Sequence, residues 1–310
     1  MNTEKIKGSL FLFFASVIWG ATFVAQSVGM DYISPFTFNT VRFFLGGLVL
    51  LPVIALFRRT PKTAFSEESA AKKAAGHRNL IAGGIVCGIL IFAATGLQQI
   101  GLVYTTAGKA GFLTALYVVL VPIIGLFFKK KPGIFLWFGV AFAVAGLYFL
   151  SMNEQFTLEK GDVPLLLCAL LFSFQILAVD HYSPLVDGVK LSCIQFFIAS
   201  ALSAVVMVIS EAPTWQAIWS ARIPLLFTGF LACGVAYTFQ ILGQKTTPPA
   251  VASVIFGLES VFAAIFGWLI LHEQLSQREL LGAALVLVAV FLSQLTPKRK
   301  AKNNSCRERS

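Results

Sequence analysis

Apolar residues dominate this chain in long blocks that short polar segments separate. Ten blocks have about the 18 residues or more that a helix needs to cross the core of a bilayer. In lipid each block must satisfy its own backbone hydrogen bonds, and each exceeds the roughly ten-residue strands of membrane barrels. The pattern therefore predicts an all-α membrane protein with ten transmembrane helices. The blocks are residues 8–28, 36–57, 80–101, 105–128, 133–151, 163–182, 189–209, 223–243, 248–271 and 278–294.

Composition supports this prediction and excludes a water-soluble globule. Hydrophobic residues make up 57% of the chain and charged residues only 12%. Soluble domains carry about a quarter charged residues, because their surfaces must be hydrated. The chain is therefore expected to reside in a membrane as a multi-pass protein.

The basic residues indicate the orientation. With a cytoplasmic N-terminus, cytoplasmic segments hold 19 of the 24 Lys and Arg residues, and the outer loops hold only Lys160, Arg222 and Arg278. The positive-inside rule then predicts a cell (inner) membrane protein with both termini in the cytoplasm. Dispersed loop charges of this kind contact membrane lipids, and without a basic-aromatic patch no nucleic-acid partner is expected.

The two halves of the chain repeat each other weakly but in one order. Each half contains five predicted helices, and an odd number means that the second copy enters the membrane from the opposite side. We expect two inverted-topology five-helix repeats, 8–151 and 163–294, followed by a basic cytoplasmic tail, 295–310. The matches include, at a shift of 153, Arg42 with Gln195, Phe43 with Phe196 and Phe44 with Phe197, and, at a shift of 141, Gln99 with Gln240.

Three stretches resemble a known family: "SVIWGATF" in the first block, "TTAGKAGFLTALYVVLVPIIGLF" in the fourth and "LESVFAAIFGWLILHEQLS" in the ninth and tenth. They are similar to the two EamA domains of the drug/metabolite transporter superfamily, over nearly the whole chain. The resemblance implies a ten-helix carrier, usually an exporter of amino acids, metabolites or drugs, with a cavity lined by helices 1, 3, 4, 6, 8 and 9. The family usually has Pro after the helix 9 glutamate, whereas this chain has Ser260, so a kink there is in doubt.

Four charged side chains fall inside the predicted helices. Glu259 lies at mid-depth, where a charge costs about 2.5 to 3.5 kcal/mol, so we expect it to bind solute or a proton; the alternative is a neutral packing acid. Lys109 either binds solute or extends to the outer interface. Arg42 is expected to be structural, anchoring helix 2 to a carbonyl cluster or an acidic partner, and the resemblance leaves this helix off the cavity. Asp180, near the cytoplasmic end of helix 6, is a gate candidate or an interfacial charge.

Uncharged polar and aromatic residues complete the predicted binding site. Gln99 and Gln240 are repeat mates, so the symmetry puts them on opposite sides of one cavity, where amides suit a zwitterionic or amide-bearing solute. Trp19, Tyr117 and Tyr237 are candidates for flat cavity walls.

Nothing in the sequence favours an enzyme. There is no phosphate-binding glycine loop and no His and Cys spacing for a metal, so no cofactor is expected. The favoured function is a secondary transporter, most often an exporter, of small metabolites such as amino acids or of drugs, working by alternating access, with proton coupling left open. The alternative is a bilayer-facing lipid-handling protein, flippase-like or acyl-transferring. The solute, the direction of flux and the oligomeric state stay undecided.

Overall fold

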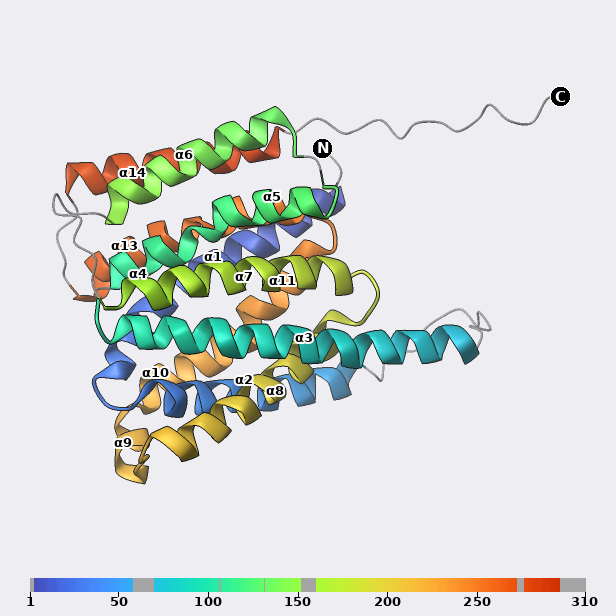
Figure 1. The fold of residues 1–310 in the computed structure, drawn as a ribbon, viewed down its shortest axis with the longest axis vertical. Helices are drawn as coiled ribbons and strands as arrows, with labels where there is room; N and C mark the ends of the chain where they lie inside the picture. Colours follow the sequence, from blue (N-terminus) through green and yellow to red (C-terminus); the bar gives the residue numbers. More distant parts are fainter. Residues whose placement is uncertain are drawn as a thin grey trace.

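Helices make up all the regular structure in the residues that the computed structural model describes, 3–57, 70–105, 107–130, 132–151, 160–271 and 276–295. Figure 1 shows them as one bundle of roughly parallel and antiparallel rods. The predicted basic tail lies outside the described residues, apart from Leu295. The elements are α1 (Thr3–Met30), α2 (Pro35–Phe57), α3 (Ala70–Leu102), α4 (Ala107–Ala115), α5 (Tyr117–Phe127), α6 (Ile134–Ser151), α7 (Asp162–Tyr182), α8 (Gly188–Ser210), α9 (Trp215–Ser220), α10 (Arg222–Phe227), the π-helical η1 (Thr228–Ala236), α11 (Tyr237–Gln244), α12 (Pro249–Phe256), α13 (Leu258–Leu271) and α14 (Gln277–Gln294).

The ten predicted blocks correspond in order to ten helical spans. Nine spans of the described chain are long and apolar enough to cross a membrane, and Ile134–Leu150 within α6 is a shorter apolar helix. The prediction of an all-α, ten-helix membrane protein is therefore confirmed. Three spans differ from the simple expectation because each contains more than one element: α4 with α5, α10 with η1 and α11, and α12 with α13.

Helix α3 is longer than predicted. It begins at Ala70 instead of residue 80, and Figure 1 shows its N-terminal end projecting beyond the neighbouring helices. Residues 70–75 read "AAKKAA", and alanine and lysine are among the best helix formers, so the helix continues past the apolar block. Hydropathy finds the membrane span and not the end of the helix.

The main helix contacts join the two halves of the chain. Helix α2 packs along α8, and α6 packs along α14, which Figure 1 shows side by side as an outer layer. In both pairs a helix meets its own repeat mate, as a two-fold axis between inverted copies requires. The matched residues Phe43 and Phe196 stack with ring centroids 5.9 Å apart and an interplanar angle of 10°. The inverted repeat is thus an interlocked structure and not two separate lobes.

Glycine allows the closest of these approaches. A Cβ atom added at Gly146 of α6 would lie 2.7 Å from the carbonyl oxygen of Gly282, and one added at Gly282 of α14 would lie 2.6 Å from that of Gly146. Backbones this close tolerate no side chain at either position. The pair behaves like the small-residue contacts that join membrane helices elsewhere.

Two spans break at equivalent points near their centres. The fourth span breaks at Leu116, between α4 and α5, and the ninth at Gly257, between α12 and α13, which is the 141-residue shift found between the repeats. Near both breaks the backbone makes i→i−3 hydrogen bonds, from Val119 N to Leu116 O at 3.0 Å and from Ser260 N to Gly257 O at 3.3 Å. The ninth span is therefore interrupted without the proline that the family usually has.

Side-chain hydroxyl groups from neighbouring helices satisfy carbonyl groups near the breaks. Ser16 of α1 donates to the carbonyl of Ile255 at 3.1 Å, and Ser260 donates to the carbonyl of Gly111 on α4 at 3.4 Å. Irregular backbone at membrane depth needs such partners, because lipid offers none. Discontinuous helices at the midplane of inverted repeats are typical of solute sites in transporters.

Candidate functional site

A central cavity lies between the two broken spans, and both repeats line it. Its free volume is about 50 Å³. A water molecule needs about 10 to 15 Å³ by this kind of measure, so the cavity has room for a few waters. All six spans that the family resemblance implies contribute to it, and α2 contributes as well. The lining residues are Trp19, Thr22, Phe23, Gln26, Arg42, Gln98, Thr114, Tyr117, Phe172, Gln175, Ile176, Ala232, Cys233, Tyr237, Gln240, Phe256 and Glu259.

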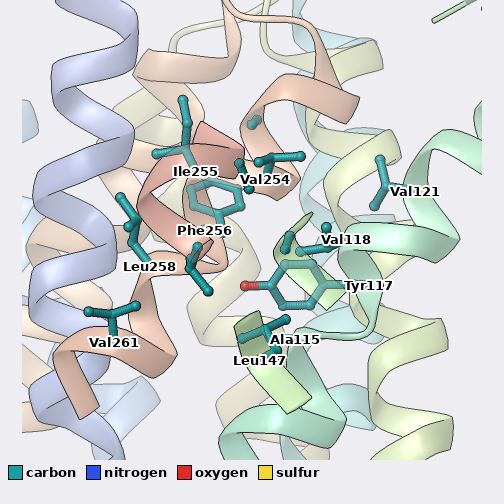
Figure 2. Packing of buried hydrophobic residues seen from close by; sticks show 14 of the residues in the cluster. Ala115, Tyr117, Val118, Val121, Leu147, Val254, Ile255, Phe256, Leu258 and Val261 are labelled. Carbon is teal, nitrogen blue, oxygen red and sulfur yellow. The ribbon is translucent and has the colours of Figure 1, made fainter. Parts of the chain in front are cut away.

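Glu259 and Tyr117 meet across the cavity from opposite repeats. Glu259 is in the first turn of α13 and Tyr117 begins α5, so each follows one of the two breaks. The Tyr117 hydroxyl donates to Oε1 of Glu259 at 2.7 Å, and both side chains are buried. Figure 2 shows the Tyr117 ring with its oxygen directed toward the ninth span, where Phe256 ends α12 and Leu258 begins α13. The predicted acid thus lies in the cavity with one hydroxyl partner.

Arg42 differs from the expectation, because it lines the cavity. Its side chain is 4% exposed, and it donates from a terminal guanidinium nitrogen to the amide oxygen of Gln26 on α1. The guanidinium also lies over the ring of Phe43, 4.8 Å from the centroid. Its Nε makes no hydrogen bond, and no Asp or Glu pairs with it, within the described part of the chain. The expected anchor exists, but it is an amide and not an acid or a carbonyl cluster.

The close contact of η1 with α2 explains this position. A Cβ atom added at Gly46 would lie 2.4 Å from Cβ of Cys233, a cavity residue of η1. Residues four apart share a helix face, so the approach at Gly46 also turns Arg42 toward η1 and the cavity. π-Helical segments occur often at functional sites. Neither the close approach nor the π segment is visible in a hydropathy pattern.

Of the two predicted amides, Gln240 lines the cavity, whereas Gln99 lies outside it and its sequence neighbour Gln98 lines it. Gln240 lines the cavity and exchanges hydrogen bonds with Gln175 of α7, the shorter at 2.9 Å. Gln99 does not line it; its amide nitrogen contacts the sulfur of Met30 at 3.5 Å. Gln98 lines the cavity instead, 3.5 Å from the Thr114 hydroxyl. A shift of 142 in place of 141 pairs Gln98 with Gln240.

Two of the three predicted aromatic residues, Trp19 and Tyr237, pack together beside the cavity. Trp19 packs edge-on against Tyr237, at a centroid distance of 4.9 Å, and against Phe256, at 5.2 Å. Tyr237 also contacts Phe196, at 5.5 Å. Edge-to-face contacts at these distances are the favourable aromatic geometry. These rings give the cavity an aromatic wall.

Lys109 and Asp180 lie outside the cavity, in two ion pairs at opposite ends of α7. At the N-terminal end of α7, Nζ of Lys109 is 3.0 Å from Oδ1 of Asp162, with side-chain exposures of 14% and 1%. At the C-terminal end of α7, Lys130 pairs with Asp180, with exposures of 40% and 20%. Lys109 thus neither lines the cavity nor extends freely to the interface. The two pairs join α7 to α4 and to the turn after α5, and Asp180 stays a gate candidate.

Comparison with known proteins agrees with the fold. The sequence profile of the EamA-like transporter family matches residues 6–152 and 159–295. An "Uncharacterized transporter" of Archaeoglobus fulgidus is 35% identical over 300 residues, 95% of this chain and 88% of that protein. The "Threonine/homoserine exporter RhtA" of Escherichia coli K12 is 27% identical over 183 residues, 58% of this chain and 60% of RhtA.

A solved structure, named only "Crystal structure of protein", has the same fold. Its TM-score is 0.73 at 18% identity, with 93% of this chain and 96% of that chain covered. This likeness concerns the fold alone, whereas the profile match extends over nearly the whole sequence. The protein is therefore a multi-pass membrane transporter and not an enzyme, and the chain belongs to the EamA-like transporter family.

Proposed function

We propose that this transporter is a secondary carrier that exports zwitterionic small metabolites, α-amino acids above all, by alternating access around the central cavity. One observation carries the proposal. A guanidinium, Arg42, and a carboxyl group, Glu259, line the same buried cavity, at 4% and 5% exposure, and neither forms an ion pair within the described residues.

A zwitterion complements both groups at once. Isolated charges in a low-dielectric interior are costly, and an opposite charge with good hydrogen-bond geometry offsets much of that cost. The forked guanidinium of Arg42 suits a carboxylate, which it can bind through two parallel hydrogen bonds. An ammonium group would in turn approach Glu259. Gln26 and Tyr117 hold these two groups and would yield their positions to the solute.

The remaining walls suit a solute with a side chain. Trp19, Tyr237 and Phe256 supply an apolar surface, and Gln98, Gln175 and Gln240 supply amide donors and acceptors. A free volume of about 50 Å³ is small for an amino acid with its side chain. The solute therefore requires the spans to move apart, and the two central helix breaks are where such movement needs least distortion.

A carboxyl group at this point also links solute to protons. Protonation of Glu259 would remove the negative charge that holds the ammonium group, so a proton and a solute would compete for one site. Protons arriving from outside would release solute there, which exchanges outward solute for inward protons. The direction is supported by the similarity to the exporter RhtA and by the implied function of the family.

The direct test is equilibrium binding to the purified protein. The panel contains α-amino acids with polar, aliphatic and aromatic side chains; for the tightest binder it adds the decarboxylated amine and the acid that lacks the amine. Each missing charge should weaken binding about 10- to 150-fold, because a hydrogen bond to a charged group contributes about 1.5 to 3 kcal/mol. Equal binding of the amine or the acid would refute zwitterion recognition.

Matched variants show which residue binds the carboxylate of the solute and which binds its ammonium group. Arg42→Gln should abolish the preference for the amino acid over its amine, and Glu259→Gln the preference over the acid. Arg42→Lys keeps the charge without the fork and should be intermediate. Arg222→Gln, an exposed arginine of α10, is the control and should leave both preferences unchanged. If no amino acid of the panel binds while another solute is transported in proteoliposomes, zwitterion recognition is refuted and the carrier function stands.

A further inference from the structure

A second hollow, a lateral groove, lies at the end of the bundle that carries the N-terminus. Its volume is about 780 Å³. Its walls come from the N-terminal part of α1, the turn between α5 and α6, the turn between α11 and α12, and the C-terminal half of α14. Lining residues such as Leu10, Leu287 and Phe291 are 44% to 72% exposed, so the groove opens sideways to the bilayer. The positive-inside count assigns this end to the cytoplasm.

The groove is amphipathic along its length. Its floor is apolar and includes Phe13, Leu136 and Leu287, whereas Lys5 and Lys130 lie at the rim. Polar side chains at the same end, Ser9 and Gln294, lie 3.4 Å apart. An apolar floor below a cationic rim matches a molecule with a hydrocarbon chain and an anionic head.

We propose that this groove binds one anionic phospholipid of the cytoplasmic leaflet, with its phosphate at Lys5 and Lys130 and an acyl chain along the floor. Charge complementarity selects this occupant, because the cytoplasmic leaflet is rich in anionic lipid and each nearby cation favours it. Lys130 pairs with Asp180, so Lys5 is the rim cation without an acidic partner in the described chain.

The floor adjoins the central helix break. Ile255 and Leu258 line the groove, whereas Phe256 and Glu259 line the central cavity. In each pair one residue precedes the break at Gly257 and the other follows it. An acyl chain would pack against the point where the ninth span is interrupted. The bound lipid is therefore expected to stabilise the folded carrier and to affect transport.

The test compares lipids on delipidated, purified full-length protein. Dioleoylphosphatidylglycerol and dioleoylphosphatidylcholine are added separately, and native mass spectrometry and thermal unfolding report bound lipid and stability. We expect one phosphatidylglycerol per chain, a higher melting temperature, and weaker binding of phosphatidylcholine. Glycerophosphoglycerol, the soluble head alone, should not bind; equal binding of it would indicate a site for soluble phosphates and refute the lipid.

Two pairs of variants locate the site. Lys5→Gln should weaken phosphatidylglycerol binding about fivefold, since one cation near the surface contributes about that factor. Lys7→Gln, two residues away, paired with Glu4 and outside the groove, should not. Leu287→Trp should fill the floor and displace lipid, whereas Leu281→Trp on the exposed outer part of α14 should not. Equal effects within either pair, or equal binding of the two lipids, would overturn the proposal.

Discussion

The central cavity and the lateral groove both adjoin the helix break at Gly257, and they differ in where their charged side chains lie. In the cavity, about 50 Å³ in volume, Arg42 and Glu259 are almost fully buried. In the groove, about 780 Å³ in volume, the cations lie only at the rim. Charged side chains buried inside a cavity can bind a small polar solute. Charged side chains at the rim of an apolar groove can bind only the head group of an amphipathic molecule and so orient it. Size alone would select the groove, whereas the proposed solute site is the smaller cavity.

The division between the two hollows depends on the break in the ninth span. Ile255 and Leu258 line the groove, whereas Phe256 and Glu259 line the cavity. Ile255 and Glu259 are four residues apart and would share a face of an unbroken helix, so the interruption at Gly257 lets them line different hollows. A single span thus separates the proposed solute site from the proposed lipid site. Substitutions of residues that line only one of the two hollows test this difference most directly.

The largest expected effect is on Glu259. Glu259→Gln keeps the hydrogen-bonding shape of the neutral acid but cannot release a proton. If Glu259 couples protons to solute, the variant should fold, still exchange solute, and fail to accumulate it under an imposed pH gradient in proteoliposomes. Leu258→Met, on the groove side, conserves volume and should transport within about twofold of the parent.

The opposite result would reassign the acid. A Glu259→Gln protein with full accumulation driven by the pH gradient would leave Glu259 as a packing residue or as a solute partner whose charge is dispensable. A Glu259→Ala protein that is lost during purification, beside a normal Glu259→Gln, would favour packing. Melting temperatures of both variants separate the two explanations.

An intermediate effect is expected for the neighbouring amides Gln98 and Gln99. Gln98→Ala removes a cavity amide and should weaken solute binding about 3- to 20-fold, since side-chain hydrogen bonds in membranes contribute about 0.6 to 1.7 kcal/mol. Gln99→Ala removes an amide that contacts Met30 outside the cavity and should leave affinity within about twofold. Affinities and melting temperatures are measured on both. A larger loss of affinity in Gln99→Ala would restore the original symmetry prediction and contradict the observed arrangement.

The smallest effect is expected at the break itself. Ser16→Ala removes the hydroxyl that satisfies the Ile255 carbonyl and should lower the free energy of unfolding by about 0.6 kcal/mol. Ser210→Ala, whose exposed hydroxyl bonds within its own helix, is the control and should change little. Unfolding in mixed micelles measures both. Equal values would mean that the break needs no external hydrogen bond.

The ten spans and the inverted repeat could be predicted from the sequence, because both depend on long patterns that tolerate small errors. Trp19, Tyr117, Tyr237, Gln240 and Glu259 were also expected at a cavity, and the structure brings all five together. Intramembrane acids and aromatic residues near repeat-related positions are few, so even a coarse symmetry argument selects them. Their part in solute binding stays a prediction.

The misplaced residues have separate causes, and a local sequence pattern records none of them. A repeat with weak identity fixes the alignment only to within one residue, and one residue turns a helix face by about 100°, which is enough to exchange Gln99 for Gln98. Arg42 was assigned to a structural role because the resemblance leaves helix 2 off the cavity, whereas its actual position depends on the contact of α2 with η1, a tertiary fact. Lys109 pairs with Asp162, which is distant in the sequence, and no local pattern indicates that contact.

The stacking of Phe43 on Phe196 bears on how such a protein could arise. Two identical half-length chains inserted in opposite directions would make this contact between copies of one residue, across the axis of a symmetric dimer. Such a dimer would carry two guanidinium groups at equivalent positions, because position 42 and its counterpart would be the same arginine. Once the halves are joined in one gene, the counterpart is free to become Gln195, a neutral side chain. Duplication and fusion would thereby let a symmetric scaffold acquire the proposed solute site, with one positive and one negative end.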